Sequence, residues 1–168
     1  ELAIRYNEEI ARYLKKYIPG FENAYFDRVA PFMGIRETRR LVGEYILTEQ
    51  DIFDCAKFDD SIAVSAYPVD LHHPVGGDCT LMWCPDCHDI PYRSLLPKKI
   101  DSLIVAGRCI SATHLALASV RVMGPAMATG EAAGKAAALS VKHNVQLRDL
   151  DVAALQTALR EEGVYLRD

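Results

Sequence analysis

The chain has 168 residues, of which 50% are hydrophobic and 25% are charged, and its formal net charge is −4. This composition is typical of a folded globular protein and excludes a disordered tail, a collagen and a coiled coil. Charges of both signs are spread along the chain, with no basic stripe and no apolar run long enough to cross a bilayer, so we expect neither a nucleic-acid nor a membrane partner.

The start of the chain and its cysteines bear on its origin. The first residue is Glu1 rather than Met, so we expect a processed or shortened product, or a fragment of something longer. Five cysteines are present, an odd number, and three of them are crowded together. This is unlike the even, dispersed set of a small secreted scaffold and favours a reducing compartment, so we expect a cytoplasmic location.

The first third of the chain predicts one long helix and one short one. Apolar residues at spacings of three and four predict a helix over residues 1–18. We expect an irregular stretch over 21–35 and then a strand over 40–47, which is rich in β-type residues. Thr48 followed by Asp51 resembles a capping box and predicts a short helix.

The middle of the chain predicts strands separated by turns. A second strand is expected over residues 61–69, closed by a turn-rich stretch at 73–78. Residues 90–97 are bracketed by prolines, which predicts a short edge strand. Residues 102–107 form a continuous apolar run that ends in glycine, as a parallel strand buried on both faces does.

The last third predicts a loop and two helices. We expect a loop over residues 108–122, then a long helix from about 124 to 142. Either Asp149 or Asp151 is expected to cap a final helix.

This organisation is incomplete for an α/β protein, because one buried parallel strand and one long helix are only a fraction of a sheet with its crossovers. We therefore predict an α/β fold that is α+β when the chain is taken alone. Residues 101–168 would be the last βα unit of a larger nucleotide-binding domain, and residues 1–100 part of a mainly antiparallel substrate or cap domain. The alternative is a small self-contained α+β domain.

The strongest candidate for chemistry begins at Gly107, at the end of the predicted buried strand. Glycine there allows close approach of a ligand to the backbone. Downstream, Pro125 begins a helix whose first amides lack partners and favour an anion or a partly negative carbonyl. That helix is built almost entirely from small residues. Spacing alone is equally consistent with a tightly packed structural helix that binds nothing.

Four segments in the right order carry a family resemblance. They are GIRETRRLVGEYILTEQDI (34–52), DDSIAVSAYPVDLH (59–72), IPYRSLLP (90–97) and SLIVAGRCISATHLALASVRVMGPAMATGEAAGKAAAL (102–139). Together they resemble FAD-dependent oxidoreductases. The resemblance implies a flavoprotein fold with two dinucleotide-binding domains, a substrate domain inserted before the last strand, and FAD as cofactor. The cofactor-binding positions it implies are Gly107, Arg108, Arg121, Met123, Gly124, Pro125, Ala126 and Met127.

A more distant resemblance, to the succinate dehydrogenase and fumarate reductase flavoproteins, implies catalytic roles. It places His114 at the position of a substrate-binding histidine and Arg121 at that of an arginine before the flavin helix. On chemical grounds His114 can also exchange a proton, and the planar guanidinium of Arg121 suits a carboxylate or the flavin carbonyl. A surface histidine and a structural arginine in a loop salt bridge are the alternatives. Two departures from that pattern are visible: Arg108 stands where those enzymes have an acidic residue, and the stretch between His114 and Arg121 is three residues longer.

Two further groups are candidates for the substrate side. Arg36 and Glu37 belong to a charged cluster that the family resemblance places near flavin or substrate, and we take Arg36 as the third catalytic candidate; a solvated edge strand is the alternative. Asp70 and His72 follow a predicted strand and are candidates for the substrate pocket, with a plain turn as the alternative.

The cysteine-rich segment is a separate question. Cys79, Cys84, Cys87 and His88 supply four ligands of the types that zinc prefers. Cys84 to His88 also match the haem-attachment string of c-type cytochromes, which we interpret as coincidence because no axial ligand is evident. Free thiols and a redox-active pair or disulfide remain open.

The sequence thus predicts the C-terminal part of an FAD-dependent oxidoreductase that transfers a hydride between a small organic substrate and flavin N5. The Gly-x-Gly-x-x-Gly pattern that cradles a dinucleotide does not occur in the sequence. We therefore expect a missing N-terminal FAD-binding half or partner chain, and an isolated chain that is inactive and binds FAD weakly. The alternative is a non-catalytic, zinc-stabilised subunit that pairs with an FAD-binding chain; a homo-oligomer is also left open.

Overall fold

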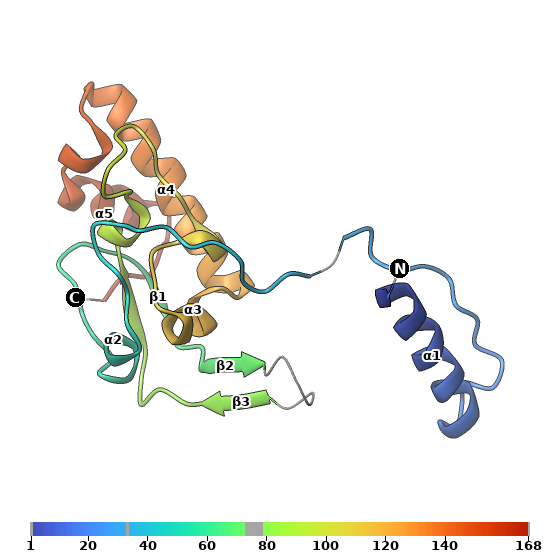
Figure 1. Ribbon diagram of the computed structural model, residues 1–168. Helices are drawn as coiled ribbons and strands as arrows, with labels where there is room; N and C mark the ends of the chain where they lie inside the picture. The colour runs from blue at the N-terminus through green and yellow to red at the C-terminus, as the bar shows by residue number, and fades with distance from the viewer. Residues whose placement is uncertain (1, 33, 73–78, 168) are drawn as a thin grey trace. The chain divides into compact units, whose positions relative to one another are not determined.

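The computed structural model describes residues 2–32, 34–72 and 79–167 (Figure 1). Its contacts divide the chain into two compact units, Glu1–Ile35 and Arg36–Asp168. The architecture is mixed α+β, with helices and small antiparallel sheets. The turn expected at 73–78 lies outside the described residues. The sequence also predicts a boundary between a substrate- or cap-domain portion, residues 1–100, and a flavin-binding portion, residues 101–168. This boundary stays a prediction.

The first unit contains helix α1, Leu2–Tyr17, which confirms the helix predicted from apolar spacing. The amide of Ile18 donates to the carbonyl of Leu14, and the chain then turns at Gly20, which has φ +94°. The described residues of the stretch over 21–35 form no helix or strand, as expected. Within the described residues, no helix of the chain combines the length and the apolar character that a membrane crossing requires.

The second unit opens with a segment that we expected to be a strand over 40–47, and this prediction is wrong. The segment makes only isolated bridges in the described chain, Gly43 with Pro97 and Leu47 with Ala112. Its hydrogen bonds are divided between two different neighbours, so no continuous ladder forms. Helix α2, Glu49–Phe53, follows with the capping box that the sequence predicted.

Two small antiparallel sheets replace the longer strands that were predicted. Strand β1, Ser61–Ser65, pairs with β4, His88–Pro91, while β2, Val69–His72, pairs with β3, Cys79–Met82. The strand expected over 61–69 is therefore two strands, since Pro68 between them has no N–H to donate to a ladder.

The edge strand expected over 90–97 is likewise mostly wrong. β4 ends at Pro91, and a 3₁₀ turn, Tyr92–Leu95, takes the place of its continuation. The Tyr92 hydroxyl donates to the carbonyl of Leu147 at 2.9 Å, which ties this turn to the C-terminal part of the unit.

The predicted parallel strand over 102–107 is also wrong for this chain. The amide of Val105 donates to Leu95, but no ladder forms among the described residues. Leu103 is 42% exposed, although an apolar run of this kind is normally buried. The segment ends in a 3₁₀ turn, Gly107–Cys109.

The C-terminal helices follow the predicted order with one addition. Within the loop expected over 108–122 lies helix α3, His114–Val120, because Thr113 caps it by accepting from the amide of Ala116. Helix α4, Met123–His143, confirms the long helix. A 3₁₀ turn, Leu147–Asp149, precedes α5, Val152–Glu161, and Asp151 is its cap.

The core of the second unit lies where α4 packs against β1 and α5 (Figure 1). Its apolar side chains come from the helices, the strands and the segments between them, and fourteen of them are completely buried. These are Leu47, Ile52, Ile62, Val69, Ile90, Leu95, Ile110, Ala116, Leu117, Val120, Ala132, Ala136, Leu155 and Leu159.

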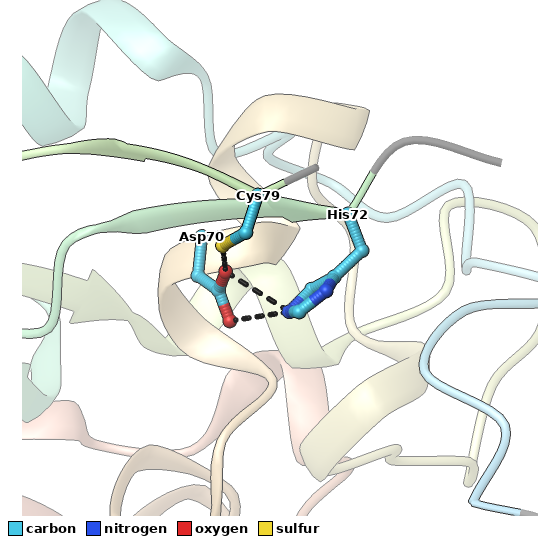
Figure 2. Close-up of side chains that lie close together, drawn as sticks. All are labelled: Asp70, His72 and Cys79. Atoms are coloured by element: carbon cyan, nitrogen blue, oxygen red, sulfur yellow. Dashed lines mark hydrogen bonds and ion pairs between the residues drawn. The ribbon is translucent and has the colours of Figure 1, made fainter. Parts of the chain in front are cut away.

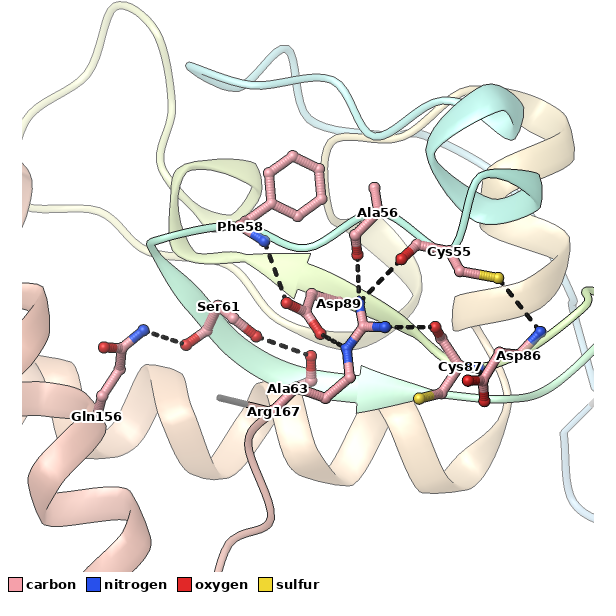
Figure 3. A network of polar contacts seen from close by, with 10 residues as sticks. All are labelled: Cys55, Ala56, Phe58, Ser61, Ala63, Asp86, Cys87, Asp89, Gln156 and Arg167. Atoms are coloured by element: carbon pink, nitrogen blue, oxygen red, sulfur yellow. Dashed lines mark hydrogen bonds and ion pairs between the residues drawn. The ribbon is translucent and has the colours of Figure 1, made fainter.

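A buried arginine fastens the C-terminal segment to this core (Figure 3). The Arg167 Nε donates to the Asp89 carboxylate at 2.7 Å, and both side chains are almost fully buried. The other guanidinium nitrogens donate to the backbone carbonyls of Cys87, Cys55 and Ala56. Each of these carbonyls would be left without this donor if the guanidinium were removed.

Replacing Arg167 with methionine is expected to lower the free energy of unfolding by about 3–5 kcal/mol, because it leaves the Asp89 carboxylate buried without its cation. Urea unfolding followed by circular dichroism measures the change. The matched control is Arg160→Met at an exposed position on α5, for which we expect a change within about 0.5 kcal/mol. Equal stabilities of the two variants would contradict this role of Arg167.

Candidate functional site

Two of the three predicted catalytic residues contact Asp70, which lies on strand β2. The Arg121 Nη2 donates to the backbone carbonyl of Asp70 at 3.0 Å and lies 3.9 Å from its carboxylate. The Arg36 Nη1 lies 3.6 Å from the same carboxylate oxygen. The structure therefore places Arg36 and Arg121 at one point, although they are far apart in sequence.

The charges at this point do not balance. Two guanidinium groups face one carboxylate, and the Asp70 side chain is only 10% exposed. Arg121 is similarly buried, whereas Arg36 is 53% exposed and can reach a second anion in solvent. The excess positive charge favours a negatively charged group on a small molecule.

His72 and Cys79 complete the surroundings of the Asp70 carboxylate (Figure 2). The His72 Nε2 lies 3.1 Å from it, and the Cys79 thiol donates to it at 2.9 Å. This thiol hydrogen bond lowers the pKa of Asp70 below its ordinary value; burial opposes the shift, and His72 and Arg121 add to it. The same hydrogen bond raises the pKa of the Cys79 thiol.

The sequence proposed Asp70 and His72 for the substrate pocket but assigned Cys79 to a different group. The missing information was the strand register, in which His72 and Cys79 are direct cross-strand partners. Alternation along β2 puts Asp70 on the same face as His72. An Asp-x-His pattern followed by a turn and a cysteine is the signal that could have indicated this arrangement.

His114, the third catalytic candidate, lies at the other end of α3 from Arg121. Its Nδ1 is 2.5 Å from Glu37, whose second carboxylate oxygen is 3.2 Å from Arg40. A carboxylate can only accept, so Nδ1 carries the proton and Nε2 is the basic atom of the neutral ring. The His114 side chain is 64% exposed. At about 1.5 Å rise per residue, the length of α3 separates His114 from the Asp70 cluster.

Gly107 makes a sharp turn that lies beside the start of α4. Its φ of +69° is in the left-handed region, which side chains other than glycine rarely adopt. The Gly107 amide donates to Thr129 Oγ1 at 3.0 Å, and a Cβ at Gly107 would be in ordinary contact with Ala126. The turn therefore packs against the first part of α4, with Arg108 exposed on it.

The beginning of α4 is suited to an electron-rich ligand group. Its N-cap, Val122, provides no side-chain hydrogen bond to the first amides. Met123, Gly124 and Met127 are exposed there, whereas Pro125 is buried. The Ala126 amide already donates to the Val122 carbonyl, so negative charge at this position would be stabilised by the amides that precede it and by the helix dipole.

The four predicted zinc ligands are not brought together. Cys79 contacts Asp70, whereas the Cys84 thiol makes a long contact, 3.9 Å, with the carbonyl of Tyr67. None of the five cysteines forms a disulfide bond. His88 is completely buried, and its Nδ1 is without a hydrogen-bond partner.

A family model described as FAD dependent oxidoreductase matches residues 2–159 of the chain. No curated protein and no solved structure matches it significantly.

Because His88 is buried, we expect the protein to lose stability in mild acid. Burial lowers its pKa from 6.5 to about 4, and the nearby Arg167 adds to this, while Asp89 and Asp51 oppose it. Between pH 6.5 and 4 the unfolded chain therefore binds a proton that the folded chain does not. The contribution of neutral His88 to the free energy of unfolding is complete above pH 6.5. It falls by up to about 3 kcal/mol as the pH drops to 4.

Urea unfolding at several pH values between 7 and 4 measures this dependence. We expect a flatter curve for His88→Gln, which cannot take up the proton, and a wild-type curve for His143→Gln at the exposed end of α4. If His88→Gln lost stability as steeply as the wild type, the acid sensitivity would come from other groups.

Proposed function

Because the chain belongs to the FAD dependent oxidoreductase family, its chemistry is flavin-linked, and we propose that it supplies the part of a flavin site where substrate and flavin ring meet. The observation that carries this proposal is the uncapped start of α4 beside the Gly107 turn. FAD, when bound, accepts or returns a hydride at N5.

The residues at the start of α4 fit this cofactor. Its first amides would donate hydrogen bonds to a flavin carbonyl that becomes more negative on reduction. Gly107 has a positive φ at which a side chain would be strained, and Gly124 has open space around it. The exposed methionines, Met123 and Met127, offer apolar surface to a flat ring.

The side chains at Asp70 and His114 would act on the substrate. Arg36 is half exposed and would bind a negatively charged group of a small organic substrate, while Arg121 is held in place by the backbone carbonyl of Asp70. Glu37 keeps the proton on Nδ1 of His114, so that Nε2 would take or return a substrate proton.

Residues outside this chain would complete the flavin site. The sequence has no Gly-x-Gly-x-x-Gly cradle for the pyrophosphate. On the side of α4 away from the core, two large apolar side chains, Met123 and Val141, are each 83% exposed. An N-terminal FAD-binding half or a partner chain would supply both the cradle and the cover.

The alternative, a non-catalytic subunit stabilised by zinc at Cys79, Cys84, Cys87 and His88, has less support. The structure does not gather these four side chains, and His88 is completely buried.

A titration with FAD tests whether the site is shared. We expect the purified chain to be colourless and to leave the absorbance and fluorescence of added FAD almost unchanged, because half of the contacts are absent. A yellow chain with one tightly bound FAD would contradict the shared site and show that these residues bind the cofactor unaided.

A charge placed at Gly124 tests the position of the flavin. In the protein loaded with FAD together with its FAD-binding half or partner chain, Gly124→Glu is expected to lower the flavin reduction potential by on the order of 10–20 mV relative to Gly124→Gln, because a carboxylate at the helix start opposes negative charge on the reduced ring. Spectroscopic redox titration measures both variants, which have the same size at a position with open space. Identical potentials would place the flavin ring away from α4.

A further inference from the structure

The β2–β3 hairpin places three metal-binding side chains on one face. Asp70 and His72 are two residues apart on β2, and Cys79 is the direct partner of His72 on β3. In a pleated pair both relations put side chains on the same side. One ligand atom from each residue lies within 4.8 Å of the other two, the one such group found in the described parts of the chain.

We propose that this hairpin binds one Zn²⁺ ion through the carboxylate of Asp70, Nε2 of His72 and Sγ of Cys79. A carboxylate oxygen, an imidazole nitrogen and a thiolate are the ligand types that zinc takes. The metal site differs from the one expected from the sequence, with which it shares only Cys79. It does not rest on the proposed flavin function.

The distances between the ligand atoms suit an ion after small side-chain movements. Tetrahedral zinc with bonds of about 2.0–2.3 Å separates its ligand atoms by about 3.3–3.8 Å. Here Asp70 lies 2.9 Å from the Cys79 Sγ and 3.1 Å from the His72 Nε2. Two hydrogen bonds thus already hold the three groups at nearly the required spacing (Figure 2).

Binding exchanges one bond for another. The S–H bond of Cys79 breaks, its proton passes to solvent, and the sulfur electron pair forms the bond to zinc. Asp70 and His72 bind as carboxylate and neutral imidazole. Three protein ligands leave a fourth position for water, which is the arrangement of an open zinc site. His72 and Cys79 are exposed, so the ion reaches the site directly from solvent.

Two arginines beside the site affect its affinity. Arg121 donates to the backbone carbonyl of Asp70 and keeps this partner when the carboxylate turns to the ion. Arg36 contacts only the carboxylate at 3.6 Å, and its charge opposes that of the metal. Removing the Arg36 charge should therefore strengthen zinc binding, whereas a site elsewhere on the chain would be unaffected.

The test is a titration of the metal-free chain with Zn²⁺ and, in parallel, with Co²⁺, whose thiolate charge-transfer band reports a bound cysteine. We expect one equivalent of each ion and a clear charge-transfer band. Cys79→Ser and His72→Gln should each weaken zinc binding by at least about 100-fold, and Cys79→Ser should abolish the band. Arg36→Gln should tighten binding by about 3–10-fold.

Matched variants separate this site from the rest of the chain. Cys109→Ser, at an exposed cysteine outside the hairpin, should bind zinc like the wild type, as should the double variant Cys84→Ser with Cys87→Ser. Circular dichroism confirms that each variant is folded. The proposal is overturned by a wild-type chain that binds no stoichiometric zinc, by full binding in Cys79→Ser, by unchanged binding in Arg36→Gln, or by loss of binding in the Cys84/Cys87 double variant alone.

Discussion

The close packing of α4 is the constraint on which the rest of the second unit depends. Its buried face consists of small side chains, and Thr129 in the middle of it is completely buried. The Thr129 hydroxyl accepts from the Gly107 amide and donates to the Pro125 carbonyl one turn earlier in the helix. A larger side chain here would push the helix away from β1 and from the Gly107 turn. The same contact thus belongs to the core and to the candidate flavin surface.

Arg121 connects that surface to the β2–β3 hairpin. It forms the C-cap of α3, lies immediately before α4, and donates to the backbone of Asp70. The hydrogen bond from Arg121 goes to the backbone carbonyl of Asp70. The carboxylate of Asp70 therefore stays available to His72, Cys79 and Arg36. A substrate anion or a metal ion at the hairpin would therefore lie close to the start of α4.

Two segments show why local pattern was insufficient for the strands. Residues 40–47 and 102–107 have strand-like sequences, yet neither forms a ladder among the described residues. A strand is defined by hydrogen bonds to a neighbour, and a β-rich sequence does not specify which neighbour is present. Helices satisfy their backbone groups internally, which explains why α1, α2, α4 and α5 were predicted correctly from spacing and caps.

The sequence by itself determined the family, the cofactor and helices α1, α2, α4 and α5. Separate motifs in the right order identify an FAD dependent oxidoreductase, and Thr48, Asp51 and Asp151 mark helix starts through hydrogen bonds made within a few residues. Only the tertiary structure decided that Arg36 and Arg121 meet at Asp70 and that Cys79 lies opposite His72 rather than with Cys84 and Cys87. These contacts depend on strand register and on the packing of α3, which are long-range properties that residue types and spacing do not encode.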